Sequence, residues 1–330
     1  MMKIKEVIGI DASKLVLDCC IHMKELQLTF SNDPDGIDQM VEWVMNSTKL
    51  FKDDILFVFE HTGLYTNQLS AVLSRKECIF YIASGLEVKR SLGILRGKDD
   101  KTDAKRIALY GYRRREEIKP AKIMSVPLAR LKRLASMRRK LISQRAGHKA
   151  TLKEQKRVLE NETILFEVQK RIIDLLTQEI RTIEKEMDNI ILEDAELNKL
   201  FRLLLSIKGI GKVTARFLII HTNGFTTFKT WRKFASYCGI APFPYRSGTS
   251  VRGRTKVSRL ANTEGKALLH LCAAGSIQYN PELKAYYENR VSQGKNKMST
   301  LNIIRNKLLS RAFSIVGRGT PYVDIMKYAS

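Results

Sequence analysis

The stretch between residues 128 and 200 constrains the fold most, because it contains no proline and only one glycine, Gly147. Both residue types interrupt helices, so their near absence predicts very long helices. Apolar residues at 173, 176, 180, 183, 187 and 190 alternate in steps of three and four, the 3.5-residue period of a coiled-coil seam. We expect an antiparallel helical hairpin that turns near residues 161–163. Two interpretations stay open: a hairpin that dimerises through this seam, and a plain helical bundle.

The region before this stretch has the pattern of an α/β domain. Four short runs are β-rich or continuously apolar, as expected of strands: residues 6–13, 15–22, 55–59 and 78–83. Residues 25–30 alternate weakly and are expected to form a further early strand. Helical spacing appears at residues 37–44 and 63–76. The expected fold class is therefore α/β plus all-α. Three domains are predicted: a mixed-sheet domain over residues 1–120, a coiled-coil helical hairpin over 121–200 and a helical domain over 201–330.

The charge of the chain is large and unevenly distributed. The 330 residues carry 58 Lys and Arg against 34 Asp and Glu, a net charge of +24. Residues 86–160 hold 23 basic and 8 acidic side chains, and residues 201–330 hold 22 and 4, whereas the segments before and between are net acidic. Two blocks this basic repel themselves unless a polyanion neutralises them. Nucleic acid is therefore the expected partner.

Several classes of protein are excluded by what the chain lacks. It contains no run of 18 or more apolar residues, so no membrane span is expected, and its first residues show no signal-peptide pattern. Its five cysteines occur without CxxC or Cys/His zinc spacing. They predict reduced, buried thiols in a cytoplasmic protein, with Cys238, beside a glycine, as the one candidate for exposure.

Residues 206–215 (SIKGIGKVTA) predict two apolar helices joined by a Gly-x-Gly turn, which is a helix–hairpin–helix pattern. The glycines allow backbone N–H groups to approach a phosphate, and Lys208 and Lys212 supply positive charge. A turn that serves packing alone is the alternative.

A loop rich in Gly, Ser and Arg is expected over residues 239–255. It contains Ser247 and Ser250, and four cations lie nearby: Arg246, Arg252, Arg254 and Lys256. A serine beside a glycine can approach a phosphate closely, and arginines stabilise charge that develops on it. From the residues alone, this loop either binds phosphate or carries a nucleophile.

Four carboxylates occupy positions that the predicted fold should bring close together. Asp11 ends the first predicted strand, Glu60 ends the central one, and Asp100 and Asp103 are three residues apart, which places them on one helical face. Converging carboxylates repel one another unless a cation lies between them, and their oxygens suit Mg²⁺ or Mn²⁺. Considered alone, each of these acids could be a helix cap or an exposed surface charge. Jointly, they predict a metal site for phosphoryl transfer.

Three acidic segments, GIDASK at 9–14, FEHTGLY at 59–65 and KDDKTDA at 98–104, resemble the DEDD transposases of bacterial insertion sequences. The segments at 206–215 and 234–262 resemble the same family. The resemblance implies a RuvC-like domain of RNase H fold followed by a transposase domain. It assigns the acidic tetrad to Asp11, Glu60, Asp100 and Asp103. Asp99 stands where the family has threonine, and it remains a possible substitute for Asp100.

The resemblance also implies the chemistry and the partners. The family places a catalytic serine in this Ser-Gly segment, matching Ser247, which would attack a DNA phosphate and form a phosphoserine link, with Ser250 as the fallback. It further implies Mg²⁺ or Mn²⁺ as cofactor, a structured bridge RNA that pairs with target and donor DNA, and a homodimer or tetramer.

We therefore predict a transposase or recombinase that cuts and rejoins DNA at insertion-element ends. One alternative is a metal-dependent junction-resolving nuclease whose C-terminal domain only binds DNA. The other is a non-enzymatic architectural protein. A covalent protein–DNA adduct separates the recombinase from the nuclease, and the architectural alternative requires acids that bind no metal.

Overall fold

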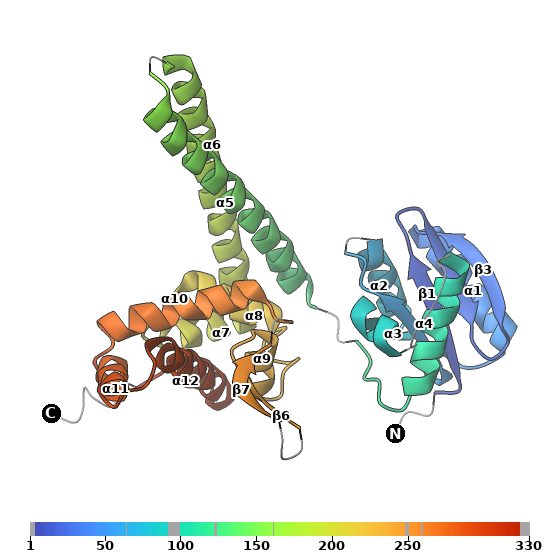
Figure 1. Cartoon of the computed structure of the whole chain (residues 1–330). Helices are drawn as coiled ribbons and strands as arrows, with labels where there is room; N and C mark the ends of the chain where they lie inside the picture. The colour runs from blue at the N-terminus through green and yellow to red at the C-terminus, as the bar shows by residue number, and fades with distance from the viewer. Residues whose placement is uncertain are drawn as a thin grey trace. The chain divides into compact units, whose positions relative to one another are not determined.

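The computed structural model describes residues 4–63, 65–91, 100–121, 124–160, 162–247, 251–258 and 260–323. At residues 100, 101, 245–247, 251, 252 and 254–256 it describes the backbone alone. Contacts between Cα atoms divide the chain into two compact units, Met1–Ile123 and Met124–Ser330 (Figure 1). The helical hairpin and the C-terminal helical region, which were expected to form separate domains, lie together in the second unit.

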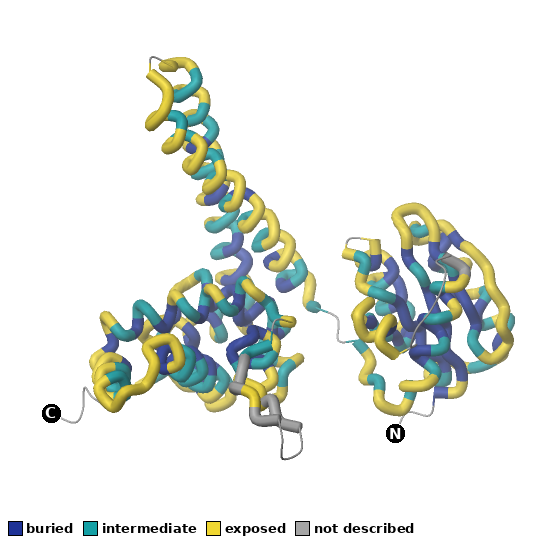
Figure 2. Tube along the Cα trace, in the orientation of Figure 1, coloured by how far each residue is buried: buried dark blue, intermediate teal, exposed yellow. Residues whose placement is uncertain are grey.

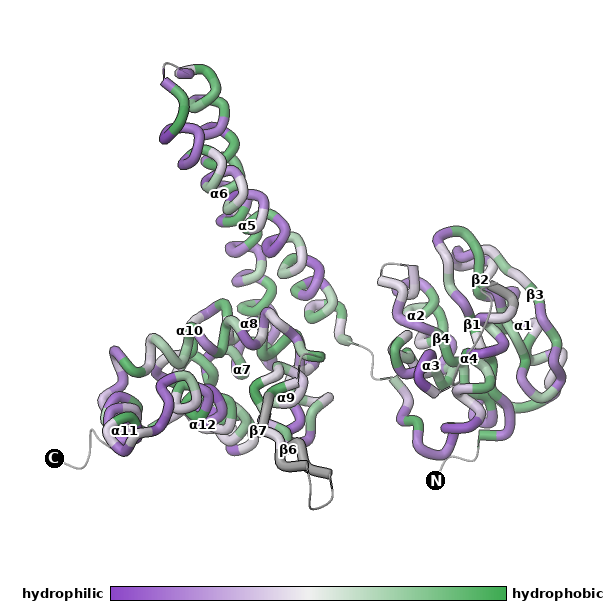
Figure 3. Tube along the Cα trace, viewed as in Figure 1, coloured by the Kyte–Doolittle hydropathy of each residue, from purple (hydrophilic) through white to green (hydrophobic). Residues whose placement is uncertain are grey.

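The first unit is built on a five-stranded mixed sheet with the order β3-β2-β1-β4-β5. The strands are β1 (Glu6–Ala12), β2 (Val16–Ile21), β3 (Leu26–Ser31), β4 (Ile55–Glu60) and β5 (Ile79–Ala83). β1 pairs antiparallel with β2 and parallel with β4, and β4 pairs parallel with β5. β1 and β4 are buried almost throughout, as Figure 2 shows, and Figure 3 shows them as mostly hydrophobic. A strand covered on both faces needs apolar residues at successive positions, which explains their composition.

Helices cover both faces of this sheet: α1 (Pro34–Thr48), α2 (Tyr65–Arg75), α3 (Gly85–Ser91) and α4 (Asp100–Arg114), with a short 3₁₀ turn at Lys52–Asp54. α1 begins at a favourable cap, because the Asp33 carboxylate accepts from the Gly36 amide at 2.8 Å and Pro34 follows the cap. α1 and α2 pack on the face that holds Ile8 and Phe57. α3 and α4 pack on the opposite face, around Val7, Leu56 and Val58.

α4 approaches the sheet more closely than a side chain would permit. A Cβ atom at Gly9 of β1 would stand 2.2 Å from the Ala104 carbonyl oxygen and 2.3 Å from the Ala108 nitrogen. A Cβ atom at Gly111 would stand 2.7 Å from a Val58 methyl carbon. These two glycines therefore let α4 lie directly on β1 and β4, which holds the first turn of α4 near the end of β1.

The second unit begins with the hairpin of α5 (Val126–Val158) and α6 (Thr163–Glu193), which run antiparallel (Figure 1). Ion pairs join the basic first arm to the acidic second arm: Arg130 to Glu186 at 2.5 Å and Arg138 to Glu184 at 2.6 Å. The apolar stripe of α6 is largely buried within the chain, at Ile173, Ile180, Met187 and Ile190. The predicted seam is thus used by the hairpin itself.

The remaining elements of the second unit are α7 (Ala195–Leu205), α8 (Lys212–His221), α9 (Trp231–Tyr237), β6 (Pro242–Ser247), β7 (Val251–Val257), α10 (Thr263–Tyr279), α11 (Pro281–Ser292) and α12 (Lys297–Arg318). Their core includes Leu204, Leu218 and Ile304, and Leu131 and Ile191 join it from the base of the hairpin. The hairpin is therefore anchored in the helical core. In the part of the chain that the structure describes, no helix is long and apolar enough to cross a membrane.

The five cysteines are free and buried, and for Cys238 the sequence expectation was wrong. Cys238 has no exposed surface, and a Cβ atom at Gly265 would stand 2.8 Å from its Sγ. Burial raises the pKa of the Cys238 thiol to about 12. The helix that precedes Gly239 packs into the core, so the neighbouring glycine does not bring the thiol to the surface.

Candidate active site

Asp11 and Glu60 occupy neighbouring places at the ends of two parallel strands. In the pair of β1 and β4, Ile10 lies opposite Phe59, so the next residue of each strand, Asp11 and Glu60, follows in register. Residues at the same level of adjacent strands project from the same face of a sheet. Both acids are partly exposed, whereas the residues before them are buried. Buried strands thus bring two carboxylates to one accessible edge.

A third carboxylate, that of Asp103, comes from the first turn of α4. Its Oδ1 accepts from Nη1 of Arg106 at 2.7 Å, one helical turn further on. Asp100 is the first residue of α4, and helical geometry places it on the same face as Asp103. Asp99 lies outside the described residues. The close packing of α4 on Gly9 keeps this acidic turn beside β1.

The pKa of Glu60 depends on its burial and on two neighbouring acids. Burial raises the pKa of the Glu60 carboxyl, and the nearby carboxylates of Asp11 and Asp103 raise it further. A raised pKa means that the ionised form is disfavoured by its surroundings. The structure therefore brings Asp11, Glu60 and Asp103 into one electrostatic group, which is the kind of site where chemistry is often found.

The surroundings of Glu60 limit where its carboxylate can lie. A Cβ atom at Gly85, the first residue of α3, would stand 2.8 Å from Glu60 Oε2. On the other side, the Thr62 hydroxyl donates to the Ala12 carbonyl at 3.2 Å, which ties the segment after β4 to the end of β1. Sequence reasoning missed Gly85, because its importance depends on a strand 25 residues earlier in the chain.

The donor set suits a divalent cation in its chemistry. Carboxylate oxygens are the ligands that Mg²⁺ and Mn²⁺ prefer. Burial is the main cause of the raised pKa of Glu60, and the charges of Asp11 and Asp103 add to it. Among the residues whose side chains are described, no three His, Cys, Asp or Glu lie close enough to hold an ion. The fourth predicted ligand, Asp100, is described by its backbone alone.

The serine loop forms a strand pair. β6 and β7 are antiparallel, Ser247 ends β6 opposite Val251, and Arg246 lies opposite Arg252. Arg254 and Lys256 follow in β7. Ser250, the fallback nucleophile, lies outside the described residues. Ser247 is thus the last residue of β6, and the paired strands β6 and β7 contain the four predicted cations.

The turn between α7 and α8 contains the two predicted lysines. Gly209 has a φ of +100°, which favours glycine, and Gly211 precedes the first turn of α8. Lys208 is exposed. Lys212 is mostly exposed too, but its Nζ lies 3.3 Å from Asp188 Oδ2 of α6. Sequence reasoning missed this pairing, because Asp188 is 24 residues away.

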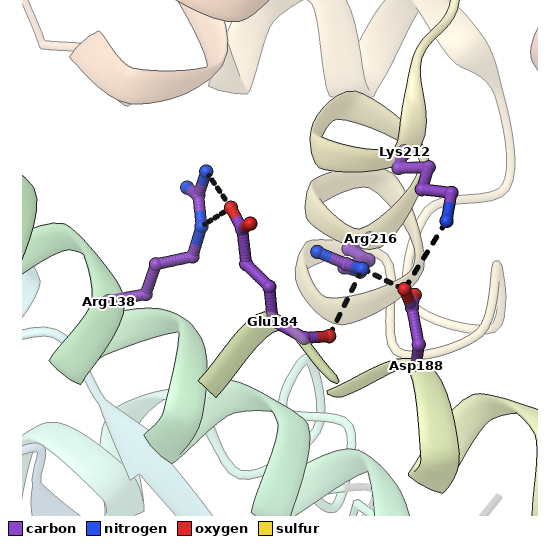
Figure 4. A network of polar contacts seen from close by, with 5 residues as sticks. All are labelled: Arg138, Glu184, Asp188, Lys212 and Arg216. Atoms are coloured by element: carbon purple, nitrogen blue, oxygen red, sulfur yellow. Dashed lines mark hydrogen bonds and ion pairs between the residues drawn. The ribbon is translucent and has the colours of Figure 1, made fainter. Parts of the chain in front are cut away.

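Figure 4 shows that Asp188 also binds Arg216, one turn further along α8. Arg216 is almost fully buried, and its Nη2 donates to the Glu184 carbonyl oxygen at 3.4 Å. Glu184 in turn pairs through its carboxylate with Arg138 of α5. This network joins three helices, so the position of α8 and its N-terminal turn is fixed relative to the hairpin.

Comparison with protein families gives two matches in different parts of the chain. A family model for DEDD transposases of the IS110 type, described as "Transposase", matches residues 8–159. A second family model, described as "Transposase IS116/IS110/IS902 family", matches residues 201–288. The first match contains the acidic group, and the second contains the α7–α8 turn and the β6–β7 hairpin. Together the two matches cover most of the chain.

Similar proteins agree with these matches. Pilin gene-inverting proteins of Moraxella bovis and Moraxella lacunata are each 26% identical over 330 residues, which covers 96% of this chain and 98% of the relative. An uncharacterised 43.6 kDa protein of insertion element IS110 from Streptomyces coelicolor is 30% identical over 131 residues, 40% of this chain and 32% of the relative. The chain therefore belongs to the DEDD transposases of bacterial insertion sequences, and it is an enzyme of DNA transposition and recombination.

Proposed function

We propose that this enzyme cuts and rejoins DNA at the ends of an insertion element, with an acidic metal site and a serine nucleophile. The observation that carries the proposal is the position of Glu60 at one edge of the sheet, where Asp11 and Asp103 are close enough to raise the pKa of its carboxyl. Asp100 completes the tetrad as the first residue of the same helix as Asp103. The strand order, with β1 between an antiparallel and a parallel neighbour, supports a RuvC-like domain of RNase H fold.

The four acids would hold Mg²⁺ or Mn²⁺. A divalent ion bound there supplies positive charge for phosphoryl transfer and lowers the barrier to attack by an oxygen nucleophile. The chain positions its acids for this role through contacts of its own. Gly85 leaves room for the Glu60 carboxylate, and Arg106 holds Asp103.

Ser247 would attack the DNA phosphate. Its oxygen forms a bond to phosphorus while the bond to the leaving DNA oxygen breaks, and the phosphoserine linkage conserves the energy needed for rejoining. Arg246 and Arg252, opposite each other in β6 and β7, favour a polyanion, because like charges at facing positions destabilise a strand pair. Arg254 and Lys256 add two further cations to the sequence of β7. The acids belong to the first unit and Ser247 to the second.

Nucleic-acid contacts outside the hairpin are proposed at the α7–α8 turn, as a helix–hairpin–helix motif. Lys208 would contact a phosphate directly. Lys212 would share its charge between Asp188 and a phosphate, because it is 63% exposed while it makes that ion pair. A structured bridge RNA that pairs with target and donor DNA, and a dimer or tetramer, complete the proposal. The basic arm of α5 and the basic C-terminal helix α12 are candidate contacts for the RNA backbone.

A junction-resolving nuclease is the second candidate, because the acidic group alone suffices for metal-dependent hydrolysis. The relatives favour recombination, since two of them are named pilin gene-inverting proteins.

The test is a denaturing gel of labelled donor DNA incubated with the wild type, Ser247→Ala and Ser250→Ala. A protein–DNA adduct in the wild type and in Ser250→Ala, but not in Ser247→Ala, is expected. An adduct that persists in Ser247→Ala and disappears in Ser250→Ala would move the nucleophile to Ser250. Cleaved DNA without an adduct in any variant would favour the nuclease.

A further inference from the structure

A cavity of about 140 Å³ lies in the second unit, between residues of α5, α6, α8 and α10. Its lining includes none of the proposed catalytic acids, neither of the candidate serines and none of the cations of β6 and β7. Its floor is apolar and includes Ala135, Met187 and Ile220. Its aromatic wall is Phe217, whose ring centroid lies 4.2 Å from that of His221. The volume suits a planar group of one or two rings and is too small for a drug-sized ligand.

His221 offers this cavity a hydrogen-bond donor of fixed position. The Asn262 amide donates to the Tyr237 hydroxyl at 2.9 Å, and that hydroxyl lies 2.9 Å from His221 Nδ1. We assign the hydroxyl hydrogen to Nδ1, which leaves the ring proton on Nε2. Burial lowers the pKa of His221, with Lys132 and Arg139 acting in the same direction and Glu264 opposing them, so the neutral ring is favoured. His221 lines the cavity, and the tautomer assigned here leaves Nε2–H as the ring donor that Tyr237 does not use.

The rim adds an acceptor and a cation. Glu264 Oε2 pairs with Arg139 Nη1 at 2.7 Å, and its side chain stays 32% exposed, so carboxylate acceptor capacity remains. Lys132 is exposed and makes no ion pair with any residue that the structure describes. The deeper cations, Arg138 and Arg216, are paired with Glu184 and Asp188 (Figure 4). The interior therefore suits an uncharged ring better than a phosphate, and the free positive charge lies at the mouth.

We propose that this cavity binds one unstacked nucleobase of single-stranded nucleic acid, with the adjoining phosphate at Lys132. A base has apolar faces for the floor and for Phe217, and its edge carries both acceptors and donors. His221 Nε2–H would donate to a ring or carbonyl acceptor of the base, and Glu264 would accept from its N–H groups. The proposal rests on the nucleic-acid function proposed above, and it adds a site that holds a base outside the reacting phosphate.

The test is isothermal titration of the full-length protein with GMP, AMP, CMP and UMP, and with ribose 5-phosphate, which lacks a base. At least one nucleotide should bind, and ribose 5-phosphate should not. His221→Phe keeps an aromatic ring but removes the donor, and it should weaken binding about tenfold, as expected for one lost hydrogen bond. Ala135→Leu fills the floor and should abolish binding. Pentanucleotides of RNA and of DNA, titrated in the same way, identify which nucleic acid supplies the base.

The lysine has a matched control on its own helix. Lys132→Gln should weaken the binding of nucleotides but not that of the corresponding nucleosides. Lys140 is also exposed on α5, and Lys140→Gln should change the binding of neither. If Ala135→Leu does not fold, His221→Phe and Lys132→Gln carry the test.

Three results would overturn the site. These are ribose 5-phosphate binding as tightly as the nucleotides, nucleotide binding unchanged in Ala135→Leu and His221→Phe, or no nucleotide binding at millimolar concentration. Adduct formation is measured on the same proteins. Loss of the adduct with intact nucleotide binding would refute the serine mechanism alone, and the reverse would refute the base site alone.

Discussion

The carboxylate of Glu60 lies against the backbone of Gly85, where an added Cβ atom would stand 2.8 Å from Oε2. The three nearest atoms to such a Cβ all belong to the Glu60 carboxylate, so a side chain at position 85 would displace that carboxylate. The Glu60 carboxylate, a proposed metal ligand, can therefore occupy its present place only because position 85 of α3 has no side chain.

Gly85→Ala should lower the rate of strand joining by about 100-fold, which is typical of a catalytic group misplaced by about 1 Å. The measurement is the rate of joining of labelled donor DNA. Gly275→Ala is the control, because an added Cβ there meets nothing within 4 Å. An unchanged rate in Gly85→Ala would show that the Glu60 carboxylate has no required position.

Glu60→Gln should abolish strand joining and yet stabilise the metal-free protein at neutral pH. Because the folded-state pKa of Glu60 is raised, the native state binds more protons than the unfolded chain once pH exceeds the unfolded value, about 4.3. The free energy of unfolding of the wild type therefore falls as pH rises through the folded-state pKa. The Glu60→Gln variant cannot ionise at this position, so its free energy of unfolding does not fall in this way. The advantage of the variant should disappear below about pH 4.

Urea unfolding in EDTA at both pH values checks this. A Trp231→Phe background leaves Trp43 as the only tryptophan, so its fluorescence reports on the first unit. Glu42→Gln, at an exposed position of α1, should show no such pH dependence. A Glu60→Gln protein that is less stable than the wild type at pH 7 would contradict the electrostatic account.

Gly9→Ala should reduce the free energy of unfolding of the first unit by about 2 kcal/mol, as expected for an overpacked core. The atoms that the new Cβ would meet, the Ala104 oxygen and the Ala108 nitrogen, belong to helix backbone and cannot turn aside. The same Trp43 measurement applies. Gly147→Ala on α5, where an added Cβ has open space, should instead stabilise the second unit by about 0.7 kcal/mol. Trp231 fluorescence in a Trp43→Phe background measures it.

Self-association, if it uses α6, should depend on Leu175 rather than on Ile180. Leu175 is 58% exposed, and Ile164 and Val168 are exposed near it, whereas Ile180 is 5% exposed within the hairpin. Leu175→Asp should weaken association, seen by analytical ultracentrifugation, at unchanged stability. Ile180→Asp should destabilise the hairpin by about 3 kcal/mol, because it buries an unpaired charge. A wild type that is monomeric both free and on nucleic acid would refute the proposed dimer.

Local patterns made part of this protein predictable. The runs at 6–12 and 55–60 indicate buried strands because both faces of each strand are apolar, and a carboxylate that ends such a run must emerge at an edge of the sheet. The register, with Ile10 opposite Phe59, comes from the structure. Strand identity and the approximate position of two acids were thus available from the sequence.

Contacts between distant segments were not predictable in this way. The glycine of GID at position 9 does not indicate that a helix about 95 residues later lies directly on it. A 3.5-residue period specifies a seam but not which helix fills it, and here α5 of the same chain does. The charge of Lys212 gives no sign of Asp188, because the pairing depends on how α8 crosses α6. Each of these features depends on tertiary packing, which local propensity leaves undetermined.

The length of the α5–α6 hairpin sets a scale for nucleic-acid contacts. At 1.5 Å per residue, the 33 residues of α5 extend for about 50 Å. Duplex DNA rises 3.4 Å per base pair, so this distance corresponds to about fifteen base pairs. A contact at the tip of the hairpin and one at its base would therefore be separated by about one and a half turns of duplex. A footprint of this enzyme should show protected regions with that spacing.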